Sequence, residues 1–140
     1  MTGRRSSRRG ALALATALAV SGCGLNVQLQ DLFLLTRTGQ GTTLRLVVND
    51  SGTMRCNGGP AKAISSALLI RARDLTDNLG TDATTHLTIA RTAGTVYYFT
   101  IKLQQGTVSF PDRLGLAHKT LSEAELFATQ SAQQVCHLPG

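Results

Sequence analysis

Thr95-Val96-Tyr97-Tyr98-Phe99-Thr100-Ile101-Lys102-Leu103-Gln104 is the clearest β-strand in the chain. Its alternate positions form two sets, with Tyr97, Phe99, Ile101 and Leu103 on one side and Val96, Tyr98, Thr100 and Lys102 on the other. A period of two in a segment rich in aromatic and β-branched residues predicts a strand with one face toward a core. Gln105-Gly106 then predicts a turn into a partner strand, Thr107 to Phe110. Val108 and Phe110 face inward in that strand, and Pro111-Asp112 ends it.

Three further strands are predicted nearer the N-terminus, at 31–38, 43–49 and 53–56. Gly39-Gln40-Gly41 and Asn49-Asp50-Ser51-Gly52 separate them. Asn and Asp bond to their own backbone and Gly accepts a positive φ, so both separators are typical of turns. The second and third strands should therefore form a hairpin.

Two apolar stripes at spacings of three and four residues predict helices. The first stripe is Ile64, Ala67, Leu68, Ala72, Leu75 and Leu79, with Gly80 as the expected C-terminal stop. The second helix is expected to start at Thr120, with Glu123 completing a capping box. Its stripe is Leu121, Ala124, Phe127, Ala128, Ala132 and Val135. The Thr-rich segment 81–94 is ambiguous, and 86–89 is a candidate short edge strand.

The order of these elements is βββ-α-ββ-α. Strands grouped in this way predict an α+β domain, with an antiparallel sheet of about five strands and two helices packed on one face. The predicted domain covers residues 31–140, a length typical of one domain with one core.

The N-terminal stretch has the residue order of an export signal. Four arginines (Arg4, Arg5, Arg8 and Arg9) precede an apolar run at 11–20 and then Val20-Ser21-Gly22-Cys23. These four residues resemble the lipobox of bacterial lipoproteins. The resemblance implies that residues 1–22 are a cleaved signal peptide and that Cys23 carries a diacylglyceryl group. Residues 23–30 are then the lipidated cysteine and a short polar tether.

The same stretch has two alternative interpretations. An uncleaved membrane helix is disfavoured because the apolar run has about ten residues, whereas a span needs roughly twenty. An ordinary secretory signal would leave three cysteines in the exported chain, an odd number. The export route stays open, since Ser7-Arg8-Arg9 partly resembles a twin-arginine signal and arginine pairs are also common in other basic signals.

Removing the signal changes the charge balance. The chain has 14 Lys and Arg against 8 Asp and Glu, and the four signal arginines account for most of the excess. The mature chain therefore keeps a net charge of about +2. No basic run interleaved with aromatic residues survives, so we expect no nucleic-acid partner.

Cys56 and Cys136 remain once Cys23 is lipidated. An exported domain with two thiols usually pairs them, so a disulfide between positions 80 apart is predicted. Two free thiols are the alternative. His137 adjoins Cys136, but the CxxC and HxxxH spacings of metal sites are missing from the sequence, so no metal is expected.

The sequence carries no recognisable catalytic motif. HExxH, GxSxG and GxxxxGK[ST] are absent, and Ser51 beside Asp50 is a turn signal. We therefore expect a protein that is not an enzyme, binds no cofactor and has a binding or structural role in the envelope. A small hydrolase is the least favoured alternative. The expected partners are the membrane, through the lipid, and an envelope protein or an extracellular peptidase.

Two resemblances bear on function. The early strand ending at Thr38-Gly39, the turn at 49–52, the aromatic strand at 97–101 with Gly106, and the two Leu-containing helices resemble emfourin, a bacterial inhibitor of thermolysin-like metallopeptidases. That resemblance implies inhibition of extracellular peptidases as the alternative function. Leu34 to Arg37, with the later segments 49–52 and 55–59, is similar to small actinobacterial lipoproteins.

Overall fold

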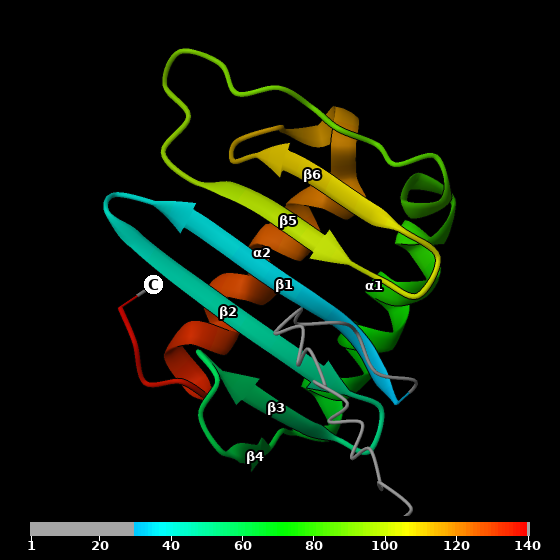
Figure 1. The fold of residues 1–140 in the computed structure, drawn as a ribbon, viewed down its shortest axis with the longest axis vertical. Helices are drawn as coiled ribbons and strands as arrows, with labels where there is room; N and C mark the ends of the chain where they lie inside the picture. Colours follow the sequence, from blue (N-terminus) through cyan, green and yellow to red (C-terminus); the bar gives the residue numbers. More distant parts are fainter. Residues whose placement is uncertain (1–29, 140) are drawn as a thin grey trace, which may run out of the picture.

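A computed structural model describes residues 30–139 and shows an α+β fold (Figure 1). Six strands form one antiparallel sheet: β1 (Asp31–Gly39), β2 (Thr42–Asn49), β3 (Thr53–Cys56), β4 (Ala61–Ala63), β5 (Tyr98–Lys102) and β6 (Thr107–Pro111). The helices are α1 (Ser66–Thr84), the 3-10 turn η1 (Leu116–His118) and α2 (Lys119–Gln134). The predicted fold class is confirmed, although the sheet has one strand more than expected. The predicted signal peptide and nearly all of the tether lie outside the described residues.

The strand order is β4-β3-β2-β1-β5-β6. Strands β1 to β4 form successive hairpins and β5 and β6 form another, and the pairing of β1 with β5 joins the two groups. Gly39 lies where β1 turns toward β2, and a Cβ there would lie 2.2 Å from the carbonyl oxygen of Val96. Glycine therefore lets the two groups of strands come together at this corner.

Both helices cover the same face of the sheet, behind it in Figure 1, and the core lies between the two layers. On the helical side this core contains the predicted stripe residues Leu68, Ala72, Leu75 and Leu79, and the whole stripe predicted for α2. On the sheet side two aromatic pairs anchor it. Phe99 stacks on Phe110 at 5.2 Å between ring centroids, and Phe33 meets Phe127 of α2 edge to face at 5.6 Å.

The structure corrects several predicted boundaries around α1. Strand β4 was missed because a three-residue strand is too short to show a period. Ile64 precedes the helix and Ala67 is exposed, so neither belongs to the fully buried stripe. The helix also continues through Gly80 to Thr84. Burial of Ala83 against the core offsets the cost of about 1 kcal/mol for an internal glycine.

The start of α2 was also predicted wrongly. The capping box at Thr120 and Glu123 is not formed, because η1 leads directly into a helix that begins at Lys119. Thr120 thus already lies inside the first turn, whereas an N-cap residue needs an extended backbone. The Ser122 hydroxyl instead donates to the carbonyl oxygen of Gly115 at 3.2 Å.

The other strand boundaries need smaller corrections. The aromatic strand is shorter than predicted and ends at Lys102, since the Leu103 backbone N–H donates to the carbonyl oxygen of Gly106 at 2.8 Å in the turn. The candidate edge strand at 86–89 is reduced to one parallel bridge between Thr88 and Ser109.

The predicted disulfide is present between Cys56, at the end of β3, and Cys136, just after α2. Their Cα atoms are 5.8 Å apart, within the range a disulfide requires. The Lys62 ammonium adds a second link by donating to the carbonyl oxygen of Val135 at 3.0 Å. The end of α2 is therefore fixed to the β3–β4 edge of the sheet.

Candidate functional site

The second face of the sheet carries no helix and is turned toward the viewer in Figure 1. Strand alternation creates this face, because successive side chains point to opposite sides. In β2, for example, Leu44, Leu46 and Val48 are buried beneath the helices, while Arg45 and Val47 are partly exposed on the other side. We call this second side the open face.

The strand register arranges the open face in rows. One row runs Arg55, Val47, Leu34, Lys102 and Thr107 across five strands. The neighbouring row runs Arg45, Thr36, Thr100 and Ser109. Neighbouring strands are about 4.8 Å apart, which places Arg55 and Lys102 roughly 14 Å from each other. The rows therefore combine spaced cations with a central group of hydroxyls.

The cations of the open face are not neutralised by other residues in the part of the chain that the structure describes. The structure records no ion pair for Arg45, Arg55 or Lys102 among residues 30–139. In that same part of the chain, Asp31 is the one carboxylate of the six strands, and it sits at the start of β1, where the Asn49 amide donates to it at 3.1 Å. Such a face is suited to an anionic or hydroxyl-rich ligand.

The charges of the two layers have opposite sign. The strands hold five cations, Arg37, Arg45, Arg55, Lys62 and Lys102, against Asp31 alone. The two α-helices hold five acids, Asp74, Asp77, Asp82, Glu123 and Glu125, against Arg71, Arg73 and Lys119. Residues 30–139 carry a net charge of only about +2, but this small value combines a basic sheet with an acidic helical layer. Such a separation of charge orients the molecule in an electric field.

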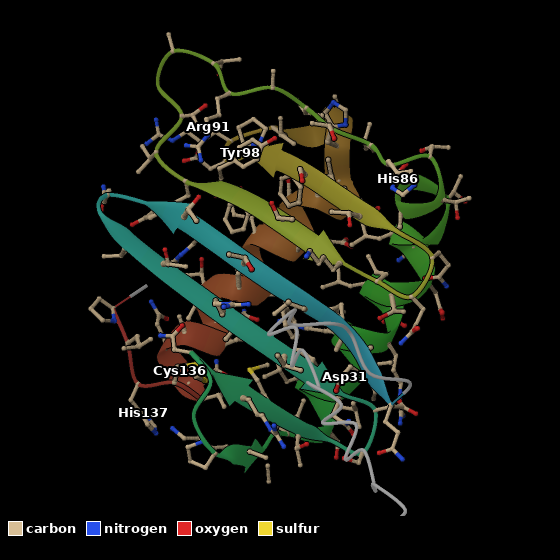
Figure 2. The ribbon with its side chains drawn as sticks, viewed as in Figure 1. Asp31, His86, Arg91, Tyr98, Cys136 and His137 are labelled. Atoms are coloured by element: carbon tan, nitrogen blue, oxygen red, sulfur yellow. A yellow bond between two sulfur atoms is a disulfide. The ribbon has the colours of Figure 1, made fainter. Side chains whose placement is uncertain are left out.

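A fourth cation extends the open face at one corner, where Figure 2 shows Arg91 beside Tyr98. The Arg91 guanidinium lies 4.5 Å from the centroid of the Tyr98 ring and donates to the Thr38 hydroxyl at 3.2 Å. The Tyr98 hydroxyl in turn donates to the carbonyl oxygen of Ile89 at 3.0 Å. These contacts hold the loop before β5 in place, with the exposed arginine above the sheet.

A buried cation lies near the same corner on the opposite side of the sheet. Arg37 is only 7% exposed, and its guanidinium lies 4.6 Å from the centroid of the Tyr97 ring. The Tyr97 hydroxyl donates to the Gln40 side chain at 3.1 Å. Arg37 therefore contributes positive charge to the sheet but no contact surface on the open face.

A shallow groove of about 320 Å³ lies between the outer surfaces of the helices. It is lined by Arg71, Asp74, Leu75, Glu123, Leu126 and Phe127. Its volume is at the lower limit for ligand pockets, and its charges have both signs. The Arg71 guanidinium already bonds the Gln130 side chain. The groove is therefore the less favourable candidate for a binding site.

The residues considered for chemistry are not brought together. Figure 2 shows His86 and His137 at opposite ends of the molecule, and His118 is exposed in η1. Within residues 30–139, no three His, Cys, Asp or Glu side chains are grouped to hold a metal ion. The predicted lipid site, Cys23, lies outside the described residues.

The open face was not identified from the sequence. Alternation alone places Lys102 opposite the inward residues of its strand. However, grouping it with Arg45 and Arg55 requires the pairing of β1 with β5, which are separated by more than fifty residues and a helix.

In the part of the chain that the structure describes, no helix is long and apolar enough to cross a membrane. Comparison of the chain with protein-family models, with curated proteins and with solved structures finds no match.

Proposed function

We propose that this protein is a lipid-anchored, extracytoplasmic envelope protein with a non-enzymatic binding role, and that its binding surface is the open face. The observation that carries the proposal is the layered charge: unneutralised Arg45, Arg55 and Lys102 on the sheet, with acids concentrated on the helices. Complementary potentials guide encounter and orientation at a binding surface.

The anchor is supported by the lipobox-like stretch at 20–23. The disulfide between Cys56 and Cys136 also suits this location, because such bonds persist in oxidising compartments outside the cytoplasm. A diacylglyceryl group supplies two acyl chains, and two chains suffice for stable membrane attachment. The folded domain itself would then need no membrane-spanning helix.

Metabolic labelling with a palmitate analogue tests the anchor. The full chain should take up the label and fractionate with membranes, whereas a Cys23→Ala chain should do neither. A Cys56→Ala chain is the matched control, because it also removes one cysteine but leaves the lipobox-like stretch intact, and it should still be labelled. Labelling of Cys23→Ala equal to that of the unaltered chain would refute the anchor.

Inhibition of an extracellular peptidase is a second candidate, favoured by the loop after β3. The Asn57 backbone N–H donates to the carbonyl oxygen of Arg45 at 2.8 Å, and the Asn57 side chain accepts from the Arg45 N–H at 2.8 Å. The adjacent disulfide fixes the loop further. A rigid exposed loop loses little conformational entropy on entering a protease cleft.

Assays of thermolysin-like and subtilisin-like enzymes with the mature protein test this alternative. Inhibition that is lost after deletion of Gly58 and Gly59, but kept after Gly41→Ala in another turn, would support it. Full peptidase activity at micromolar protein would argue against it.

A further inference from the structure

Resting on the proposed lipid anchor, we propose that the open face docks on the anionic phospholipid headgroups of the membrane that holds the anchor. The occupant is thus the bilayer itself, bound through Arg45, Arg55, Lys102 and Arg91. This assignment specifies both the partner of the face and the orientation of the domain, with the sheet toward the membrane and the helices away from it.

The length of the tether supports this partner. Seven residues, Gly24 to Gln30, separate Cys23 from the start of β1. Seven residues span at most about 23–25 Å when fully extended. The domain is therefore kept close to the bilayer surface, where headgroups are present at high effective concentration. A binding face on a domain so close to the membrane meets lipid before any other ligand.

The charges determine which side faces the bilayer. An anionic surface attracts the sheet, whose cations outnumber its single carboxylate, and repels the helices, whose acids outnumber their cations. Guanidinium groups donate paired hydrogen bonds to phosphate oxygens. The Thr36 hydroxyl lies in the same region, beside the hydroxyls of Thr100 and Ser109, which are bonded to each other at 3.3 Å and keep one donor for a ligand.

The face lacks the features needed for deep insertion. The row from Arg55 to Lys102 contains two apolar residues, Val47 and Leu34, and Leu34 is buried. The aromatic ring of Tyr98 on this face is already in contact with Arg91, and its hydroxyl donates to Ile89. Docking should therefore be electrostatic and sensitive to salt. Each Lys or Arg near an anionic surface raises the affinity for that surface about fivefold. Removal of two of these cations should therefore largely release the open face from the membrane.

The three lysines of the chain provide a direct test. Lys102 is exposed on the open face, Lys119 is exposed at the start of α2, and Lys62 donates to Val135. The lipidated protein would be reconstituted in vesicles of phosphatidylcholine, or of equal parts phosphatidylcholine and phosphatidylglycerol. Acetylation of each lysine by an amine-reactive ester would then be followed by mass spectrometry.

We expect Lys102 to react several times more slowly on the anionic vesicles than on the neutral ones, with Lys119 unchanged. High salt should abolish the difference. A chain with Arg45→Gln and Arg55→Gln should lose most of this difference in Lys102 reactivity. A control chain with Arg71→Gln and Arg73→Gln on α1 loses the same amount of positive charge but should keep the difference in Lys102 reactivity. The amide hydrogen-exchange protection of β5 would confirm that each variant is folded.

Three outcomes would overturn the proposal: Lys102 fully reactive on both kinds of vesicle, Lys102 protected to the same extent on both, or protection of Lys119 in place of Lys102. Protection of Lys102 to the same extent on both kinds of vesicle would indicate that another part of the chain, such as the tether, covers the open face. Protection in native envelopes but not on anionic vesicles would assign it to a polymer or a protein. Flotation with neutral vesicles reports the anchor separately, so failure of the anchor and failure of docking are distinguishable.

Discussion

At the scale of single residues, two glycines that look alike in the sequence have opposite roles. A Cβ on Gly106 would lie 2.1 Å from the carbonyl oxygen of Ala83, whereas nothing lies within 4 Å of one on Gly80. We expect Gly106→Ala to lower the free energy of unfolding by about 1–3 kcal/mol through overpacking. Gly80→Ala, inside α1, should raise it by about 0.5–1 kcal/mol. Urea unfolding of both variants measures the difference, and equal shifts would contradict the close approach of α1 to the β5–β6 turn.

Ser131 offers a second test at this scale. It is fully buried on α2, and its hydroxyl has no hydrogen-bond partner among the described residues. Ser131→Ala should therefore raise the free energy of unfolding by about 1 kcal/mol, because an unpaired hydroxyl is costly to bury. Ser122→Ala, which loses the bond to Gly115, should lower it by about 0.5–1 kcal/mol. Thermal unfolding would separate the two, and a destabilised Ser131→Ala would indicate a partner for that hydroxyl.

At the scale of elements, the sequence predicts those with a long period well. In β5, buried residues such as Phe99 and Ile101 alternate with more exposed ones, and the apolar stripe of α2 covers about four turns. In both elements the residues predicted to face the core are the ones that are buried. The errors fall where tertiary contacts outweigh local propensity. Burial of Ala83 carries α1 past Gly80, and η1 shifts the start of α2 ahead of Thr120. Helix ends depend on such contacts, which no local pattern reports.

The disulfide yields a prediction about α2. Its stripe contains Ala124, Ala128 and Ala132, and small side chains bury less apolar area than leucine. Its C-terminal end is held by the Cys56–Cys136 bond and by Lys62. Reduction should therefore increase hydrogen exchange first in the last turns of α2 and leave β5 protected, because β5 pairs on both sides in the sheet. Simultaneous loss of protection in both elements would contradict this order.

At the scale of the whole molecule, two hairpin systems meet at β1 and β5, and this meeting assembles the open face. The residues that form the face come from separate elements, and only the long-range register aligns Arg55, Lys102 and their neighbours. Local sequence patterns therefore could not predict the candidate site, whereas the disulfide could be predicted from the number of cysteines and the expected export of the chain. The separation of charge between layers is likewise a property of the assembled domain.

We propose above all that the open face, and not the helical layer, is the contact surface in the envelope. Photocross-linking in intact cells tests it most directly, with a benzophenone side chain replacing Thr100 on the open face or, as control, exposed Asp77 on α1. We expect lipid or protein adducts from position 100 and few from position 77. Adducts from position 77 alone would contradict it.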